Sequence, residues 1–195
     1  NAGAGLGNLT YDAEHDLIYV SDLDTGDIYR LNMKGEILDS YDHGVAGREV
    51  EKMPPFEDDP NDRADITSPQ FKSDDPTTWG YAQPPRRVWG VKAFGGRLYY
   101  AVAEGPEIWS IALGADGEFD APRRELALPT DVEPYEIADI SFTADGVMIL
   151  AQRPPVTGSY DYVTTVATGP ARVLRYKPGP SDEERWVPVP EEYAI

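Results

Sequence analysis

Hard oxygen ligands are concentrated in one short stretch of this sequence, residues 57–65, which reads EDDPNDRAD. The side chains that could hold a cation there are Asp58, Asp59, Asn61, Asp62 and Asp65. Such a density of carboxylate and amide oxygens suits calcium, although the stretch lacks the spacing of an EF-hand loop and Pro60 restricts how the backbone could wrap an ion. We therefore interpret it as a solvated acidic loop, with a calcium site as the alternative.

Few other residues offer catalytic chemistry. His15 and His43 are the only histidines, and neither belongs to an HxH or HExxH zinc pattern. No GxSxG, P-loop or GxGxxG motif stands at a strand-to-helix junction, and no helix is predicted. The sequence contains no cysteine, which excludes disulfide bonds and thiolate chemistry. These observations favour a protein without enzymatic activity and leave an enzyme as the alternative.

Two long segments, 46–86 and 154–170, interrupt an otherwise regular pattern. Loops of such length are usually functional or disordered. The first is rich in Pro and Asp but also contains aromatic residues, so we expect it to be partly ordered and to pack over one face of the fold. Trp79 and Tyr81 could instead stack on carbohydrate. The aromatic candidates for contact with a partner, taken from both segments, are Phe56, Phe71, Trp79, Tyr81, Tyr160 and Tyr162.

The regular part begins with short runs rich in Leu, Ile, Val, Tyr and Thr, each bounded by turn residues. In the first unit these runs are LGNLTYD, LIYVSD, DIYRLN and EILDSY. Asp24-Thr25-Gly26 and Met33-Lys34-Gly35 suit tight hairpin loops in which glycine adopts a positive φ. The unit therefore predicts a four-stranded antiparallel meander.

The same order returns twice downstream. VWGVKAF, RLYYAVA, EIWSIAL and RRELALP form a second set of strands, and IADISFT, VMILAQR, ARVLRYK and RWVPVP form a third. A unit of about 40 residues with four strands is typical of a β-propeller blade. The sequence thus predicts an all-β propeller domain with blades over 5–45, 87–130 and 136–190, the last interrupted by the 154–170 segment. The first strands, with Gly7, Asn8, Gly90 and Asp139, are expected nearest the ring axis.

The phrase LTYDAEHDLIYVSDLDTGDIYRLNMKGEIL resembles the blades of NHL-repeat and gluconolactonase-like (senescence-marker-like) propellers. The resemblance covers the first unit well and the other two by strand order and turn placement. It implies either a scaffold or a lactonase-like hydrolase with a metal at the centre of the ring. No residue here matches that metal-binding set one by one.

Three blades do not close a ring, since propellers typically have about four to eight. We therefore expect an open arc, completed by further blades outside this segment or by a protein partner. The function that the sequence favours is a noncatalytic scaffold or binding module whose long loops contact a protein or polymer. The alternative is part of a metal-dependent lactonase-like or other hydrolytic propeller enzyme.

Charge and hydropathy limit the kinds of partner and the cellular compartment that we expect for this chain. The net charge is −18, from 35 acidic and 17 basic residues, and so disfavours nucleic acid and anionic membrane surfaces. No run approaches the roughly 18 apolar residues of a membrane span. A periplasmic or extracellular location is favoured, because a segment removed upstream of Asn1 is expected.

Overall fold

The computed structural model describes residues 5–59, 66–75, 78, 80–129, 135–154, 167–169 and 171–189. These residues form three four-stranded antiparallel sheets, and in each the strands are neighbours in sequence order. The first sheet contains β1 (Leu6–Asp12), β2 (Leu17–Asp22), β3 (Asp27–Asn32) and β4 (Ile37–Asp42). The second contains β5 (Val88–Phe94), β6 (Arg97–Val102), β7 (Glu107–Leu113) and β8 (Phe119–Ala127). The third contains β9 (Ile137–Phe142), β10 (Met148–Gln152), β11 (Arg172–Pro178) and β12 (Trp186–Pro188).

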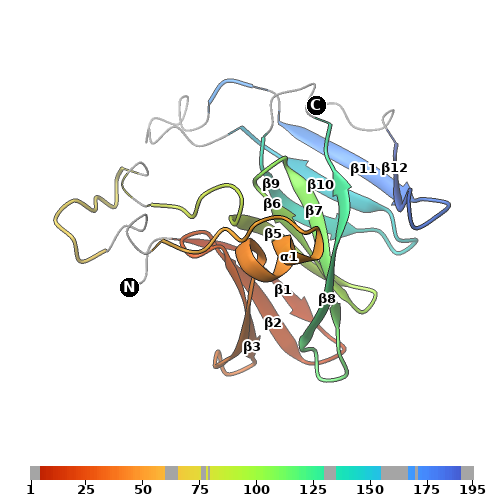
Figure 1. Ribbon diagram of the computed structural model, residues 1–195, viewed down its shortest axis with the longest axis horizontal. Helices are drawn as coiled ribbons and strands as arrows, with labels where there is room; N and C mark the ends of the chain where they lie inside the picture. Colours follow the sequence, from red (N-terminus) through yellow and green to blue (C-terminus); the bar gives the residue numbers. More distant parts are fainter. Residues whose placement is uncertain are drawn as a thin grey trace.

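The sheets stack face to face as an open arc, with the second sheet between the other two (Figure 1). One apolar cluster lies between the first and second sheets and includes Tyr19, Ile28, Tyr100 and Trp109. Another lies between the second and third sheets. The all-β, blade-like architecture expected from the sequence is thereby confirmed.

The second sheet is buried on both faces, because each face meets another sheet. Five consecutive residues of β6, Leu98 to Val102, are buried, whereas burial alternates along β2 and β10. Alternation is the pattern of a strand with one covered face, and a continuous apolar run is that of a strand covered on both. Sequence pattern and packing therefore agree.

The first strands of the three sheets converge, as expected. β5 contacts both β1 and β9, and the Nδ2 of Asn8 donates to the Ala138 carbonyl at 3.1 Å and to Asp139 Oδ1 at 2.8 Å. Gly90 makes the approach possible, since a Cβ there would lie 3.2 Å from the Asp139 nitrogen. β4, β8 and β12 occupy the opposite edges of their sheets.

The expected hairpin turns are also confirmed. Gly26, Gly35 and Gly146 have φ of 77°, 80° and 84°. In the left-handed region a side chain would clash with the backbone, so glycine is favoured there.

Two local features differ from the expectation. β8 begins at Phe119, ahead of the expected RRELALP run, because Leu113 and Phe119 pair across a turn that contains Gly117. Pro122 is tolerated within β8 because this is an edge strand. A short helical segment, a π-turn at His43–Gly47 followed by α1 at Arg48–Val50, also opens the first insertion, where no helix was predicted.

The first insertion is anchored at both ends. The Phe56 nitrogen donates to the Gly44 carbonyl at 2.8 Å, and the Ala82 nitrogen donates to the Leu23 carbonyl at 2.7 Å. Arg86, only 2% exposed, forms ion pairs with Asp27 and Asp42 on the first sheet. The two ends of the insertion are thus held against the first sheet and the turn that follows it.

Candidate functional site

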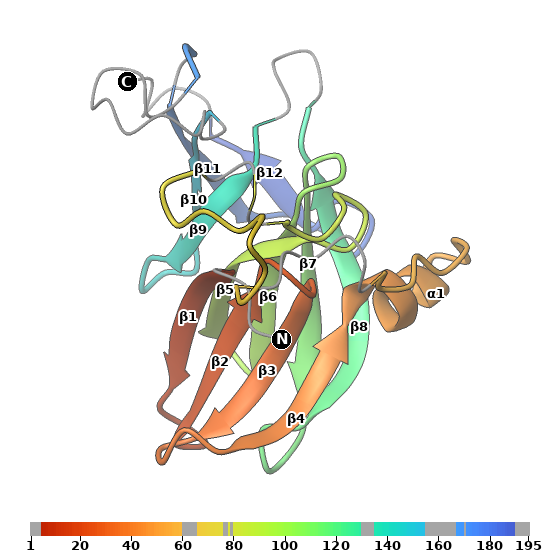
Figure 2. The ribbon, with the colours of Figure 1, turned by 90° about the vertical axis from the view of Figure 1, so that its left-hand side faces the viewer.

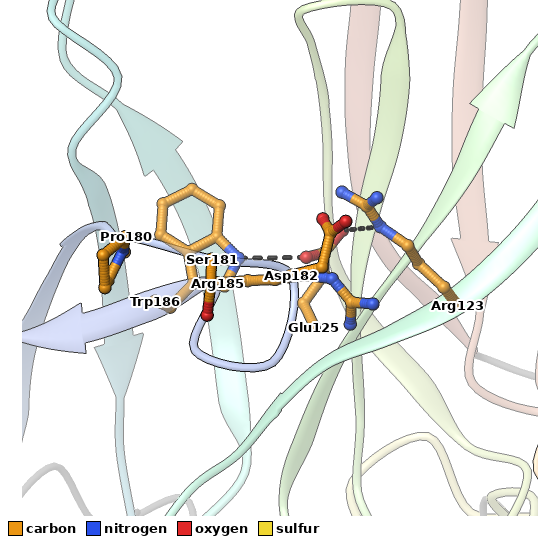
Figure 3. A pocket seen from close by; sticks show the side chains of 8 residues that line it. Arg123, Glu125, Pro180, Ser181, Asp182, Arg185 and Trp186 are labelled. Carbon is orange, nitrogen blue, oxygen red and sulfur yellow. Dashed lines mark hydrogen bonds and ion pairs between the residues drawn. The ribbon is translucent and has the colours of Figure 1, made fainter.

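A cleft of about 420 Å³ opens between the second and third sheets (Figure 3). Its walls come from β8 and from the segment that connects β11 to β12. The side chains that give it its chemistry are Arg123, Glu125, Pro180, Asp182, Arg185 and Trp186. The cleft therefore combines two guanidinium groups, two carboxylates and an indole.

Glu125 is the centre of the cleft's hydrogen-bond network, and its side chain has no exposed surface. It accepts hydrogen bonds from the Ser110 hydroxyl, from Arg123 Nε at 2.9 Å and from Trp186 Nε1 at 3.0 Å. Burial alone would raise the pKa of Glu125, but these hydrogen bonds outweigh it and hold the pKa below its usual value. Glu125 is therefore ionised at neutral pH.

Three arginines surround this buried carboxylate. Arg97 Nε lies 3.8 Å from Glu125 Oε1 and donates to the Ser110 hydroxyl at 2.7 Å, and Arg185 Nη1 donates to the Arg124 carbonyl at 2.8 Å. Burial lowers the pKa of Arg97, and the nearby charge of Arg123 lowers it further. An arginine cannot give up its proton under ordinary conditions, so the cluster stays positively charged.

The strand geometry explains why these groups meet. Successive residues of a strand point to opposite faces, which places Arg123 and Glu125 on the cleft side of β8 and Arg124 on the other. Arg124 accordingly pairs with Glu107 at 3.1 Å and with Glu51 at 3.2 Å. From the third sheet, the link between the Gly179 nitrogen and the Arg185 carbonyl at 2.7 Å closes the loop that brings Arg185 and Trp186 to β8.

The charged and aromatic side chains of the cleft could hold a ligand, and the hydroxyl of Ser181 lies in the same lining. The one hydroxyl in the Glu125 network, that of Ser110, already donates to the carboxylate. Charged donors and an aromatic wall are typical of a site that orients an anionic group.

A second surface of interest is the outer face of the first sheet, which Figure 2 shows in front of β5–β8. We call it the open face and define it by its two cross-strand rows. The first row is Leu9, Val20 and Tyr29, and the second is Tyr11, Ile18 and Leu31. Leu9 is 63% exposed and Tyr11 is 50% exposed.

The same two rows exist in the second sheet, where they are covered. Val91, Tyr100 and Trp109 pair across β5, β6 and β7 as Leu9, Val20 and Tyr29 pair in the first sheet. All three belong to the cluster between the first two sheets, and at most 1% of each is exposed. In the third sheet the corresponding row is Ile140, Leu150 and Leu174. The open face is therefore the register equivalent of a surface that a neighbouring sheet covers elsewhere in the fold.

The residues predicted to hold calcium fall partly within the described chain. Asp58 is half-buried and Asp59 is exposed, whereas Asn61, Asp62 and Asp65 lie outside the described residues. In the described part of the chain, no three His, Cys, Asp or Glu side chains are grouped so that they could hold a metal ion. A calcium site in this stretch stays a prediction.

Of the six aromatic candidates for partner contact, the structure describes three. Phe56 is 36% exposed, Phe71 is half-buried in a turn closed on the Ser68 carbonyl, and Tyr81 is half-buried. Burial raises the pKa of Tyr81, and so does the nearby charge of Asp24. Trp79, Tyr160 and Tyr162 lie outside the described residues. Their partner role stays a prediction.

The two histidines have different surroundings. His15 Nδ1 contacts Asp12 at 2.6 Å in a hairpin loop, and this hydrogen bond raises the pKa of His15. His43 is the buried first residue of the helical turn; its Nδ1 lies 3.0 Å from the Tyr100 hydroxyl, and its ring is edge-on to Trp109. Burial lowers the pKa of His43 to about 3. His43 is therefore a neutral part of the core.

A metal at the centre of the ring, which the lactonase-like resemblance implies, does not fit the inner strands as described. The amide of Asn8 is already bound to the carboxylate of Asp139, and the described residues supply no third carboxylate or imidazole to complete a group there. We derive no reaction step through such a metal.

Sequence reasoning missed the cleft. The sequence signal for the cleft is weak, because an Arg-Arg-Glu run in a strand normally indicates a solvated edge strand. The burial of Glu125 becomes visible only in the structure, where Trp186 and Ser110 donate to its carboxylate.

No protein family matches the chain, and no curated protein is significantly similar to it. Among the described residues, no helix is long and apolar enough to cross a membrane. The case for function therefore rests on the open face and the cleft.

Proposed function

We propose that this chain is a noncatalytic β-propeller scaffold or binding module whose open face receives a further four-stranded sheet, and whose long loops contact a protein or polymer partner. The observation that supports this best is the register equivalence between the open face and the covered face of the second sheet. The resemblance of the first unit to NHL-repeat and gluconolactonase-like blades agrees with it.

Energetics favours covering the open face. Fully burying one exposed large apolar side chain stabilises a protein by about 1.5–3 kcal/mol. Of the six apolar side chains on this face, Leu9 and Tyr11 are exposed and the other four are half-buried, so the gain from covering the four is smaller. Contiguous apolar patches of this kind are uncommon on soluble monomers and usually mark an interface. Repeat proteins bury such end surfaces against a neighbour or a cap.

The repeat also indicates what the covering surface looks like. The first sheet covers the second with Tyr19 and Ile28, both fully buried, and the second covers the third with Tyr99 and Ile108. In each case the tyrosine lies on the second strand and the isoleucine on the third. A sheet with the same pair would complete the open face, whether it belongs to this polypeptide or to a partner.

The solution state of the 195-residue chain tests the proposal. We expect it to self-associate or to bind a hydrophobic dye such as ANS, and the Val20→Lys, Leu31→Lys double variant to reduce both by several-fold. Met33→Lys is the matched control, because Met33 is an exposed apolar side chain in a turn outside both rows, and it should change neither strongly. A monodisperse monomer that melts cooperatively and binds no dye would refute the proposal.

The metal-dependent hydrolase remains the alternative hypothesis. Stoichiometric calcium or zinc in the purified protein, lost on chelation together with lactonase or esterase activity, would favour it over the scaffold.

A further inference from the structure

The cleft between the second and third sheets brings charged side chains of both signs together. Two guanidinium groups, those of Arg123 and Arg185, line it together with two carboxylates, those of Glu125 and Asp182. The lining is therefore neutral, in a chain of net charge −18. Guanidinium groups in a neutral lining make the approach of an anion less unfavourable here than at the acidic surface of the chain.

The arginines also have hydrogen-bonding capacity left over. Arg123 uses Nε on Glu125, and Arg185 uses Nη1 on the Arg124 carbonyl. Neither Nη of Arg123 nor Nη2 of Arg185 donates to any of the residues described here. Arg185 Nε is buried and has no partner in that same part of the chain. A buried donor without an acceptor is costly, and an oxyanion beside these guanidinium groups supplies acceptors.

The side chains that line the cleft indicate what the uncharged part of a ligand would be. Trp186 and Pro180 line the cleft beside the arginines, and its volume of about 420 Å³ lies within the range of small-molecule sites. The Trp186 indole is fixed by its hydrogen bond to Glu125 and by edge contact with Tyr99. A fixed aromatic wall suits an apolar or ring-shaped body.

We propose that this cleft binds a small organic monocarboxylate, with its carboxylate between Arg123 and Arg185 and its body against Trp186 and Pro180. The planar fork of a guanidinium matches the two oxygens of a carboxylate. A monoanion is favoured over a phosphate dianion, because the dianion would place a second negative charge beside Glu125 and Asp182. This inference does not depend on the scaffold proposal, since it concerns a different surface.

Chemical labelling of arginine tests the site in the whole 195-residue chain. The rate at which phenylglyoxal modifies each arginine is measured by mass spectrometry of peptides. The measurement is repeated at increasing concentrations of benzoate, acetate or inorganic phosphate. We expect benzoate to protect Arg123 and Arg185 saturably, at concentrations at least tenfold below those at which acetate or phosphate protect. Arg30, which donates to the Asp116 carbonyl away from the cleft, is the internal control and should label at an unchanged rate.

Substitutions provide the second arm. Arg123→Lys keeps the charge but loses the fork, and should weaken benzoate protection of Arg185 at least tenfold. Arg124→Lys changes the neighbouring residue, which pairs with Glu107 and Glu51 outside the cleft, and should leave that protection unchanged. Three outcomes would each overturn the proposal. They are non-saturable protection that is equal at Arg30, tighter protection by phosphate than by benzoate, and an equal loss of benzoate protection in the Arg123→Lys and Arg124→Lys variants. The wild-type benzoate result stands even if a variant fails to fold.

Discussion

The amide of Asn8 donates to the carboxylate of Asp139 across 2.8 Å, and this bond joins the first sheet to the third although 131 residues separate the two side chains. Asn8 also donates to the Ala138 carbonyl, so both hydrogens of one amide are used on β9. The three inner strands are therefore held together by a polar contact as well as by the apolar clusters on either side of the second sheet.

Asn8→Asp should destabilise the fold by about 0.5–1.5 kcal/mol, because it removes both donors and places a second carboxylate against the exposed Asp139. The urea midpoint measured by pulse proteolysis reports the change. Asp139→Asn is the matched control, since its amide oxygen can still accept from Asn8, and it should cost less than about 0.5 kcal/mol. Equal losses in both variants would show that the amide donor is unimportant.

Replacing Glu125 with Ala should cost about 3–5 kcal/mol, the usual effect of breaking a buried ion pair. The substitution leaves the Ser110 hydroxyl, Arg123 Nε and Trp186 Nε1 without their acceptor. Asp120→Ala, at an exposed position of the same strand, should change stability by less than about 0.5 kcal/mol. The same urea assay measures both, and a small effect at Glu125 would mean that water replaces the carboxylate.

His43 should make the fold weaker in acid. Its pKa in the folded chain, about 3, lies below the ordinary value of 6.5, so between these values the unfolded chain binds a proton that the folded chain does not. Stability from this group is fully present above pH 6.5 and is lost as the pH falls towards 3, by roughly 2 kcal/mol at pH 5. His43→Gln should lose about that much less stability between pH 7 and pH 5 than the wild type, and an identical pH dependence in both would contradict the burial of a neutral imidazole.

Gly26 and Gly35 offer a matched pair of turn positions. Both have positive φ, but a Cβ at Gly26 would lie 2.5 Å from the Arg86 carbonyl oxygen, whereas a Cβ at Gly35 would meet nothing within 4 Å. Gly35→Ala should therefore cost about 1–2 kcal/mol from the backbone conformation alone. Gly26→Ala should cost more, and protease cleavage of the 46–86 insertion should accelerate in that variant only, because Arg86 anchors the insertion.

The sequence by itself determined the strands, their order and their turns, because these depend on residues close together in the chain. The alternation from Leu17 to Asp22 predicts a strand with one covered face, and the continuous apolar run from Leu98 to Val102 predicts one covered on both. Gly26, Gly35 and Gly146 mark their turns by the conformation that only glycine adopts easily. Three repeats of one pattern were enough to predict an open arc of three sheets.

Only the tertiary structure decided which polar groups are buried and which apolar face is uncovered. Glu125 receives its hydrogen bond from Trp186, 61 residues away, and His43 meets Tyr100 from 57 residues away. Leu9 and Val91 are equivalent in their strands, yet Leu9 is 63% exposed and Val91 1%, because only one of them has a sheet packed against it. Burial is a property of contacts between distant segments, and a local pattern of residue types does not contain it.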